Sequence, residues 1–158
     1  MISTDAWNID TNNITFNPNI TRLSNGSKHM GIGLKNKKLL IQTSFMNCPF
    51  GLSSNKYDND KYTIDLSFDL ENKEHKKFHK KLLKLDKLII NEILNRSSIL
   101  FTNKLSNTVI ENNYCSLIKK TKGYAPRFRI KLPYEDNKFN FEIIDTENNN
   151  VDDLNKYL

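Results

Sequence analysis

The amino-acid sequence predicts a mainly β protein that contains one long helix. Residues 61–70 alternate apolar and polar side chains, which is typical of a strand with one buried face. Residues 74–95 instead repeat apolar side chains every three or four positions, which is typical of an amphipathic helix. Alternation returns in residues 127–132 and 138–145. We therefore expect one folded domain over residues 14–145, with a flexible lead-in over 1–13 and a short acidic flexible tail over 146–158.

Two strands are expected before residue 61. Ile14, Thr15 and Phe16 form a weak first strand, which Asn17 and Pro18 end. The Ser-Asn-Gly-Ser sequence of residues 24–27 predicts a turn. Residues 38–45 then have the β-branched and apolar content of a buried strand.

The helix expected over residues 74–95 has an apolar stripe and a lysine-rich outer side. The stripe consists of Phe78, Leu82, Leu85, Ile89 and Ile93. A solvated helix face explains the lysines better than a flank that attracts phosphates. His75 and His79 stand at the i, i+4 spacing that can hold a metal ion, but no third ligand is evident, so we expect both to be surface histidines.

The second half of the chain completes the expected order of elements. Residues 99–114 are expected to form short helical turns. We expect a β-hairpin in which residues 127–132 pair with residues 138–145 across a turn over 133–137. Its rings Phe128, Phe139 and Phe141 are expected in the core. Five strands with a helix between the third and the fourth is the order of the OB-fold, a small Greek-key barrel. An α+β sandwich fits the same pattern.

Charge is distributed unevenly along the chain. The formal net charge is +6 and the sequence pI is about 9.2, which favours a polyanionic partner such as nucleic acid. Residues 21–42 carry basic side chains and no acidic one. From residue 135 onward, seven acidic residues face two lysines. A basic body and an acidic end therefore coexist.

The most basic stretch, residues 119–131, combines cations with aromatic rings. Its sequence is KKTKGYAPRFRIK, with no acidic residue. Cations hold phosphates and aromatic rings stack on exposed bases, so the combination suits a single nucleic-acid strand. For this stretch taken alone, an ordinary strand with Phe128 and Ile130 in the core and a solvated opposite face explains the pattern slightly better.

The loop of residues 47–53 places a proline, an aromatic ring and a glycine side by side. Its sequence is Asn-Cys-Pro-Phe-Gly-Leu-Ser. Such a compact loop either caps the end of a barrel or presents Phe50 to a ligand, and capping is favoured on chemistry alone.

The sequence gives no indication of an enzyme, a metal site or a cofactor. Cys48 and Cys115 lack a CxxC pattern and a histidine at ligand spacing. No nucleophile elbow or phosphate-binding loop is evident. No run approaches the roughly 18 apolar residues that span a bilayer, and no secretion signal is recognised. We therefore expect no membrane association and an intracellular location.

Three segments carry a resemblance to a known family. They are Pro49-Phe50-Gly51-Leu52-Ser53, Tyr62-Thr63-Ile64-Asp65-Leu66-Ser67-Phe68 and residues 124–133, Tyr-Ala-Pro-Arg-Phe-Arg-Ile-Lys-Leu-Pro. Together they resemble the single-stranded-DNA-binding proteins of nucleocytoplasmic large DNA viruses, a family related to the OB-fold single-stranded-DNA-binding proteins of podophage replication. The resemblance extends from about residue 39 to residue 145.

The resemblance implies an OB barrel, a role in viral DNA replication or recombination, and no enzymatic activity. It also implies contacts of an acidic tail with the viral DNA polymerase or other replication proteins, and a location at viral replication sites in the host cytoplasm or in the virion. Here the tail is short and mildly acidic. A homodimer is left open.

The binding hypothesis assigns phosphates to cations and bases to aromatic rings. Arg127, Arg129 and Lys131 hold phosphates, and Tyr124, with Phe50 or Tyr57, stacks on bases. The expected nucleic-acid-binding residues are Lys35, Lys37, Lys38, Phe50, Lys119, Lys120, Lys122, Tyr124, Arg127, Arg129 and Lys131. The alternative is a structural or scaffold protein of the virion with a basic surface.

Overall fold

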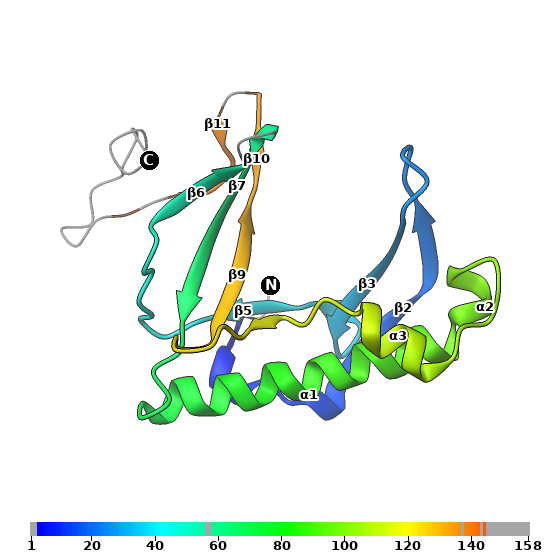
Figure 1. The fold of residues 1–158 in the computed structure, drawn as a ribbon, viewed down its shortest axis with the longest axis horizontal. Helices are drawn as coiled ribbons and strands as arrows, with labels where there is room; N and C mark the ends of the chain where they lie inside the picture. Colours follow the sequence, from blue (N-terminus) through cyan, green and yellow to red (C-terminus); the bar gives the residue numbers. More distant parts are fainter. Residues whose placement is uncertain (1–2, 56–57, 137, 143, 145–158) are drawn as a thin grey trace. The chain divides into compact units, whose positions relative to one another are not determined.

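The structure, a computed structural model, describes residues 3–55, 58–136, 138–142 and 144 and combines helices with several sheets (Figure 1). The chain divides into two compact units. Unit 1 comprises residues 1–45 and 69–117, and unit 2 comprises residues 46–68 and 118–158. The chain therefore passes between the units three times. The domain expected over residues 14–145 includes parts of both units and stays a prediction.

Helix α1 (Lys73–Asn95) confirms the helix expected over residues 74–95. It begins at Asn72, whose side-chain oxygen accepts hydrogen bonds from the backbone N–H groups of Glu74 and His75 at 2.9 and 3.2 Å. The expected apolar stripe faces inward, because its first three members are buried and its last two are half-buried. In order, they are Phe78, Leu82, Leu85, Ile89 and Ile93.

Residues 3–13, within the stretch expected to be a flexible lead-in, form a short strand and two 3-10 helices of unit 1. Strand β1 (Ser3–Asp5) pairs in parallel with β5 (Leu40–Gln42). The short 3-10 helices η1 (Ala6–Asn8) and η2 (Thr11–Asn13) follow, and η1 packs against α1. Ala6, Ile9 and Thr11 are buried. These few apolar residues lie among polar ones, so their alignment with α1 gives no periodic signal in the sequence.

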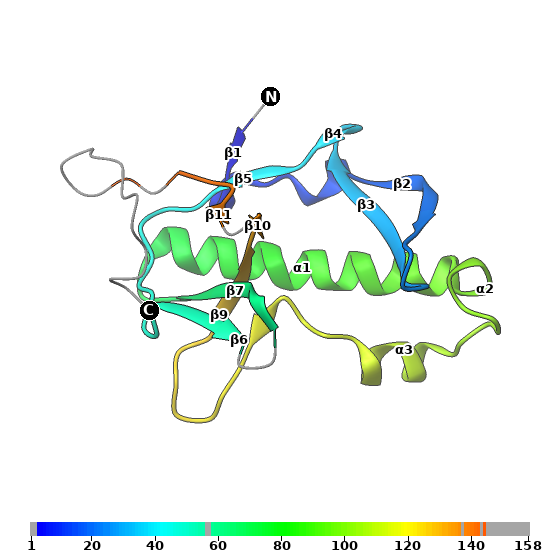
Figure 2. The same cartoon turned by 90° about the horizontal axis from the view of Figure 1, so that it is seen from above.

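A second part of unit 1 is the antiparallel sheet of β2 (Ile14–Arg22), β3 (Lys28–Leu34) and β4 (Lys37–Lys38), which Figure 2 shows. Asn17 and Pro18 do not end β2, because the pairing with β3 shifts register between Phe16 and Ile20 and a bulge accommodates the proline. The single strand expected over residues 38–45 is replaced by the short strands β4 and β5.

The short helices expected over residues 99–114 are confirmed. They are α2 (Ser97–Leu100) and α3 (Asn107–Asn113), and Ile110 of α3 is buried. Ser106 begins α3, and its hydroxyl accepts a hydrogen bond from the N–H of Val109 at 3.4 Å. Both helices pack against α1.

His75 is buried, so its assignment as a surface histidine is wrong. Its Nδ1 accepts a hydrogen bond from the N–H of Asp69 at 3.1 Å. Its Nε2 lies 2.9 Å from the carbonyl oxygen of Phe45, which has only an acceptor to offer. The imidazole is therefore the neutral tautomer with its hydrogen on Nε2. His75 thus joins the backbone at Phe45 and at Asp69 to the first turn of α1.

Asp86 is a second buried polar residue of α1, and it accepts hydrogen bonds from a segment that follows much later in the chain. Its carboxylate accepts hydrogen bonds from the Tyr114 hydroxyl at 2.7 Å, the Ser116 hydroxyl at 2.6 Å and the N–H of Leu117 at 3.1 Å. Burial, and then the bond to this carboxylate, raise the pKa of Tyr114 well above its ordinary value. Asp86 therefore fixes the segment that follows α3 onto α1.

Unit 2 contains an antiparallel sheet in the order β6-β7-β9-β8 (Figure 1). Its strands are β6 (Leu52–Asn55), β7 (Asp58–Ser67), β8 (Ile118–Lys119) and β9 (Arg127–Leu132). Strands β7 and β9 confirm the strands expected from alternation at residues 61–70 and 127–132, although β7 ends at Ser67.

The hairpin expected between residues 127–132 and 138–145 does not form as predicted. Strand β9 pairs along its whole length with β7, and its first two residues, Arg127 and Phe128, also pair with β8. Among the described residues, strand β11 (Lys138–Phe139) pairs with β10 (Tyr134–Glu135) and not with β9. The rings of Phe139 and Phe141 join Tyr62 and Tyr134 in a half-buried cluster with centroids 4.7 to 5.2 Å apart.

The described residues form four separate sheets, and none of these sheets closes into a barrel. The fold is therefore a mixture of sheets and helices, where a mainly β five-stranded barrel was expected. The first expected strand pairs within unit 1, as β2 with β3, and the third pairs within unit 2, as β7 with β6 and β9.

Replacing Asp86 with alanine should lower the free energy of unfolding by roughly 2–4 kcal/mol, because three donors lose one buried charged acceptor while the helix keeps a favourable residue. Urea denaturation of the variant and the wild type measures this change. The neighbouring exposed variant Lys87→Ala is the control and should change stability by less than about 0.5 kcal/mol. A loss below about 1 kcal/mol in Asp86→Ala would contradict the holding role.

Candidate nucleic-acid interface

One face of the unit 2 sheet carries the polar side chains of two neighbouring strands. Strands β7 and β9 pair with Thr63 opposite Lys131, Asp65 opposite Arg129 and Ser67 opposite Arg127. Side chains that lie opposite each other in a sheet point to the same face. The three basic side chains of β9 therefore share a face with an acidic residue of β7.

Asp65 forms an ion pair with two arginines at the centre of this face. Its carboxylate accepts two hydrogen bonds from Arg129, from Nε at 2.6 Å and from Nη2 at 2.9 Å. Nη1 of Arg127 lies 3.5 Å from the same carboxylate. Asp65 is only 4% exposed. The hydrogen bonds from Arg129 hold the pKa of Asp65 below its ordinary value, and the carboxylate raises the pKa of Arg129.

Arg127 also lies over the ring of Phe50. Its guanidinium carbon is 4.9 Å from the ring centroid, which is the geometry of a cation–π contact. The loop before β6 makes this possible, because the N–H of Gly51 bonds to the carbonyl of Cys48 and Gly51 adopts a positive φ of 60°. Phe50 is nevertheless 54% exposed. The loop thus presents Phe50 on the surface, although the sequence favoured a capping role.

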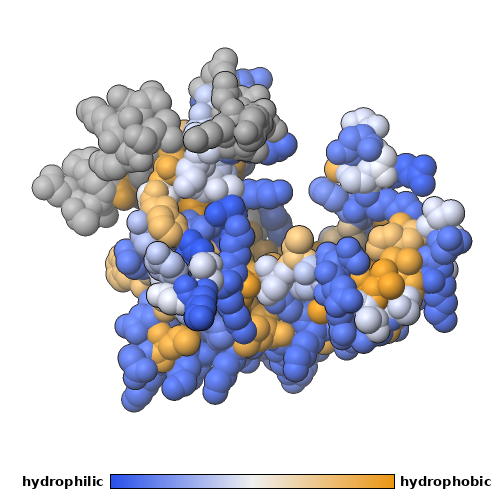
Figure 3. All heavy atoms as spheres, viewed as in Figure 1, coloured by the Kyte–Doolittle hydropathy of each residue, from blue (hydrophilic) through white to orange (hydrophobic). Residues whose placement is uncertain are grey.

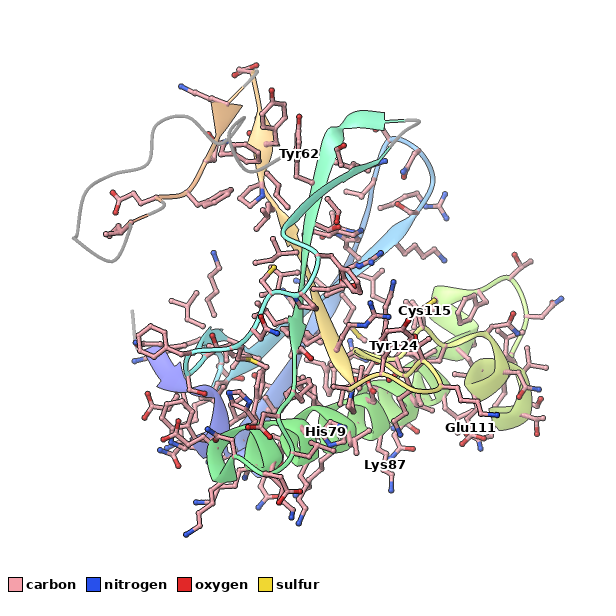
Figure 4. The ribbon with its side chains drawn as sticks, turned by 60° about the vertical axis from the view of Figure 1, so that its left-hand side comes forward. Tyr62, His79, Lys87, Glu111, Cys115 and Tyr124 are labelled. Atoms are coloured by element: carbon pink, nitrogen blue, oxygen red, sulfur yellow. The ribbon has the colours of Figure 1, made fainter. Side chains whose placement is uncertain are left out.

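The loop between β8 and β9 presents a second ring. The N–H of Tyr124 bonds to the carbonyl of Thr121, and Gly123 adopts a φ of 82° in this turn. Tyr124 is 69% exposed, and Figure 4 labels it in the loop that precedes β9. The Thr121 hydroxyl accepts a hydrogen bond from Nη2 of Arg127 at 3.0 Å, so the same arginine contacts the Tyr124 loop and Phe50.

Unit 2 also carries exposed lysines on β8, on β9 and in the loop between them. Unit 2 brings together most of the residues expected to bind nucleic acid, on β8, β9 and the two loops. They are Phe50, Lys119, Lys120, Lys122, Tyr124, Arg127, Arg129 and Lys131, and all four lysines are exposed. Their side chains are available to an anion.

Lys35, Lys37 and Lys38 belong to unit 1 and not to this cluster. They lie at the turn from β3 to β4, where Lys35 and Asn36 adopt positive φ values of 49° and 60°. All three lysines are exposed. Tyr57 and the tail of residues 146–158 lie outside the described residues.

The pairing of Asp65 is the main feature that sequence reasoning missed. The sequence placed Asp65 on a strand face without naming a partner. An opposite charge on a strand with matching alternation was the available signal, but the register that aligns Asp65 with Arg129 requires the structure.

Other kinds of site find no support among the described residues. No group of three His, Cys, Asp or Glu side chains could hold a metal ion there. Over the same part of the chain, no helix is both long enough and apolar enough to cross a membrane.

Comparisons of the chain with models of protein families, with curated proteins and with solved structures found no match. The functional argument therefore depends on the side chains themselves.

Replacing Asp65 with asparagine should lower the free energy of unfolding at pH 7 by about 1–2 kcal/mol, because it removes the charged acceptor of a bond to a partly exposed arginine. Because the pKa of Asp65 is depressed by folding, its stabilisation is full above the ordinary value of 3.8 and is lost as the pH falls through the lower folded value. The stability gap between wild type and variant should therefore narrow below about pH 4.

Urea denaturation of both proteins from pH 2 to pH 7 measures this narrowing. The exposed variant Glu142→Gln is the control and should show no comparable gap at pH 7. A gap that stays constant through the acid range would contradict the ion pair.

Proposed function

We propose that unit 2 binds single-stranded DNA without sequence preference. The observation that carries this proposal is the exposure of two aromatic rings, Phe50 and Tyr124, among four exposed lysines on one sheet and its loops. Exposed aromatic rings among cations are typical of surfaces that bind unpaired strands, since rings stack on bases and cations attract phosphates. The net charge of +6 supports a polyanionic partner.

The phosphate contacts are assigned chiefly to the four lysines, because the arginines of β9 have other partners. Arg129 donates two hydrogen bonds to Asp65, although its side chain stays 43% exposed. The charges of Asp65, Arg127 and Arg129 together sum to +1. The lysines Lys119, Lys120, Lys122 and Lys131 are therefore the main free cations of the interface.

A role in viral DNA replication or recombination is the finer part of this proposal. Its support is the resemblance of residues 49–53, 62–68 and 124–133 to the viral single-stranded-DNA-binding family. A relationship to the OB-fold also belongs to this proposal. It is supported by the order of elements, with α1 between β7 and β9 in the chain, although the described sheets do not close into a barrel. Polymerase contacts through the acidic tail are part of the same proposal.

A scaffold function is the second candidate, and one surface of unit 1 favours it. Ile99, Phe101 and Val109 are exposed apolar residues of α2, α3 and their connection. Figure 3 shows hydrophobic surface over these helices. A mostly apolar hollow of about 510 Å³ lies there, lined by residues that include Phe101, Leu105 and Val109. Surfaces of this kind commonly contact other proteins.

Fluorescence anisotropy with a labelled dT oligonucleotide and its duplex counterpart tests the proposal at low and moderate salt. We expect strand-selective binding whose affinity falls steeply as salt rises, because phosphate contacts release counterions. Equal, weak binding to both forms would reject the proposal and leave the scaffold function. A stable stoichiometric assembly formed without DNA would support that alternative.

The triple variant Lys119→Gln, Lys120→Gln, Lys122→Gln should make the salt dependence shallower by about 2 in the slope of log affinity against log salt, since each phosphate contact on a single strand contributes about 0.7. The matched control removes three exposed lysines from α1, as Lys76→Gln, Lys77→Gln, Lys80→Gln, and changes the net charge equally. An equal effect of both variants would indicate general attraction without a defined phosphate site.

A further inference from the structure

We infer that Arg127 is a positioning residue that holds Phe50 as a stacking platform, with Asp65 and Thr121 fixing the arginine from behind. On this inference, which rests on the proposed function, the Phe50 part of the interface contacts bases and the lysines contact phosphates. Arg127 is then not a phosphate ligand, although its charge and its place in the basic stretch suggest that role.

The nitrogen atoms of Arg127 face the protein. Nη1 lies 3.5 Å from the Asp65 carboxylate, and Nη2 donates to the Thr121 hydroxyl at 3.0 Å. Nε is shielded from solvent and has no hydrogen-bond acceptor among the described residues. The side chain of Arg127 is 16% exposed, against 43% for Arg129. A phosphate would have to displace these partners before it could reach the guanidinium group.

The guanidinium group supports the Phe50 ring. A planar cation over one face of a benzene ring is attracted to the ring's π electrons and restricts the ring's position. Phe50 is still half exposed, so a large part of the ring remains open to a flat partner. Every nucleic-acid base has a flat face, whereas a phosphate has none.

The buried carboxylate of Asp65 explains why Arg127 can support the Phe50 ring without binding a phosphate. Without Asp65, a guanidinium group on a surface that binds DNA would be drawn to the nearest phosphate. Asp65, on the neighbouring strand β7, lies 3.5 Å from Nη1 of Arg127 and offsets part of that charge, while it also accepts two hydrogen bonds from Arg129. Base contacts and phosphate contacts are thereby assigned to different side chains, and a duplex, whose bases are stacked inside, cannot use the ring.

The test compares a dT oligonucleotide with an abasic oligonucleotide of equal length, which carries the same phosphates without bases. The full chain is titrated with each at several salt concentrations. The wild type should bind dT more tightly. Arg127→Lys, which keeps the charge and loses the flat support, should lower dT affinity by about tenfold. It should leave abasic affinity within about twofold and the salt slope unchanged.

Two further variants separate positioning from charge. Phe50→Leu should reproduce the Arg127→Lys result, and the double variant should be no weaker than Phe50→Leu alone, because both changes remove one stacking contact. Lys119→Gln should do the opposite: it should weaken binding to both oligonucleotides equally and make the salt slope shallower by about 0.7.

The inference is overturned if Arg127→Lys weakens binding to dT and abasic strands equally, or if Phe50→Leu leaves the preference for dT intact. If the thermal melt shows that Arg127→Lys does not fold, the preference of Phe50→Leu for dT over the abasic oligonucleotide decides whether the inference stands. If the wild type binds neither oligonucleotide, the proposed function itself fails. Tight wild-type binding with no preference between the two strands overturns only the stacking platform.

Discussion

Two buried polar side chains of α1 form hydrogen bonds with the backbone at the positions where the chain leaves or re-enters unit 1. His75 bonds to the carbonyl of Phe45 and to the N–H of Asp69, and Asp86 bonds to the N–H of Leu117. Phe45 and Leu117 are the last residues of the two segments of unit 1, and Asp69 is the first residue of its second segment. A backbone group in such a place lacks a strand or helix partner, and a side chain on a rigid helix satisfies it. The position of each passage on unit 1 depends on these bonds.

The apolar face of α1 supports the same arrangement. Phe78, Leu82 and Leu85 are buried, and η1 packs against the helix. Burial of the apolar stripe stabilises the helix, and the stable helix keeps His75 and Asp86 within hydrogen-bonding distance of their partners. The polar bonds are therefore consequences of the hydrophobic pattern, since neither residue could reach its partners from a frayed helix.

In unit 2, a single carboxylate organises two arginines. Asp65 pairs with Arg129 by two hydrogen bonds and lies within 3.5 Å of Arg127, which in turn contacts Phe50 and Thr121. Removing water from Asp65 has a free-energy cost, which the two cations offset. The consequence is geometric: side chains that would otherwise move freely on a surface are held in one arrangement before any ligand arrives.

Local patterns in the sequence predicted the elements whose own residues define them. The periodicity of residues 74–95 and the alternation at 61–70 and 127–132 gave α1, β7 and β9 close to their observed bounds. Which strands pair was harder to predict from the sequence, because pairing depends on contacts between segments that are far apart in the chain. Pro18 looked like the end of a strand, and only a register shift opposite β3 shows why the strand continues. Likewise, the rings and lysines of the candidate site could be named from the sequence, but the pairing of Asp65 with Arg129 and Arg127 could not.

The interleaved path of the chain has a consequence for biosynthesis. Residues 3–13 and 40–42 belong with α1, yet the whole of β6 and β7 is translated between them and the helix. On the ribosome, the 3-10 helices of residues 6–13 must wait for α1 to emerge before they can pack on it, and β7 must wait for β9 about 60 residues later. Contacts between such distant segments slow folding, because a long loop has to close before they form. No single cleavage point separates the two units, so neither can be produced alone by simple truncation.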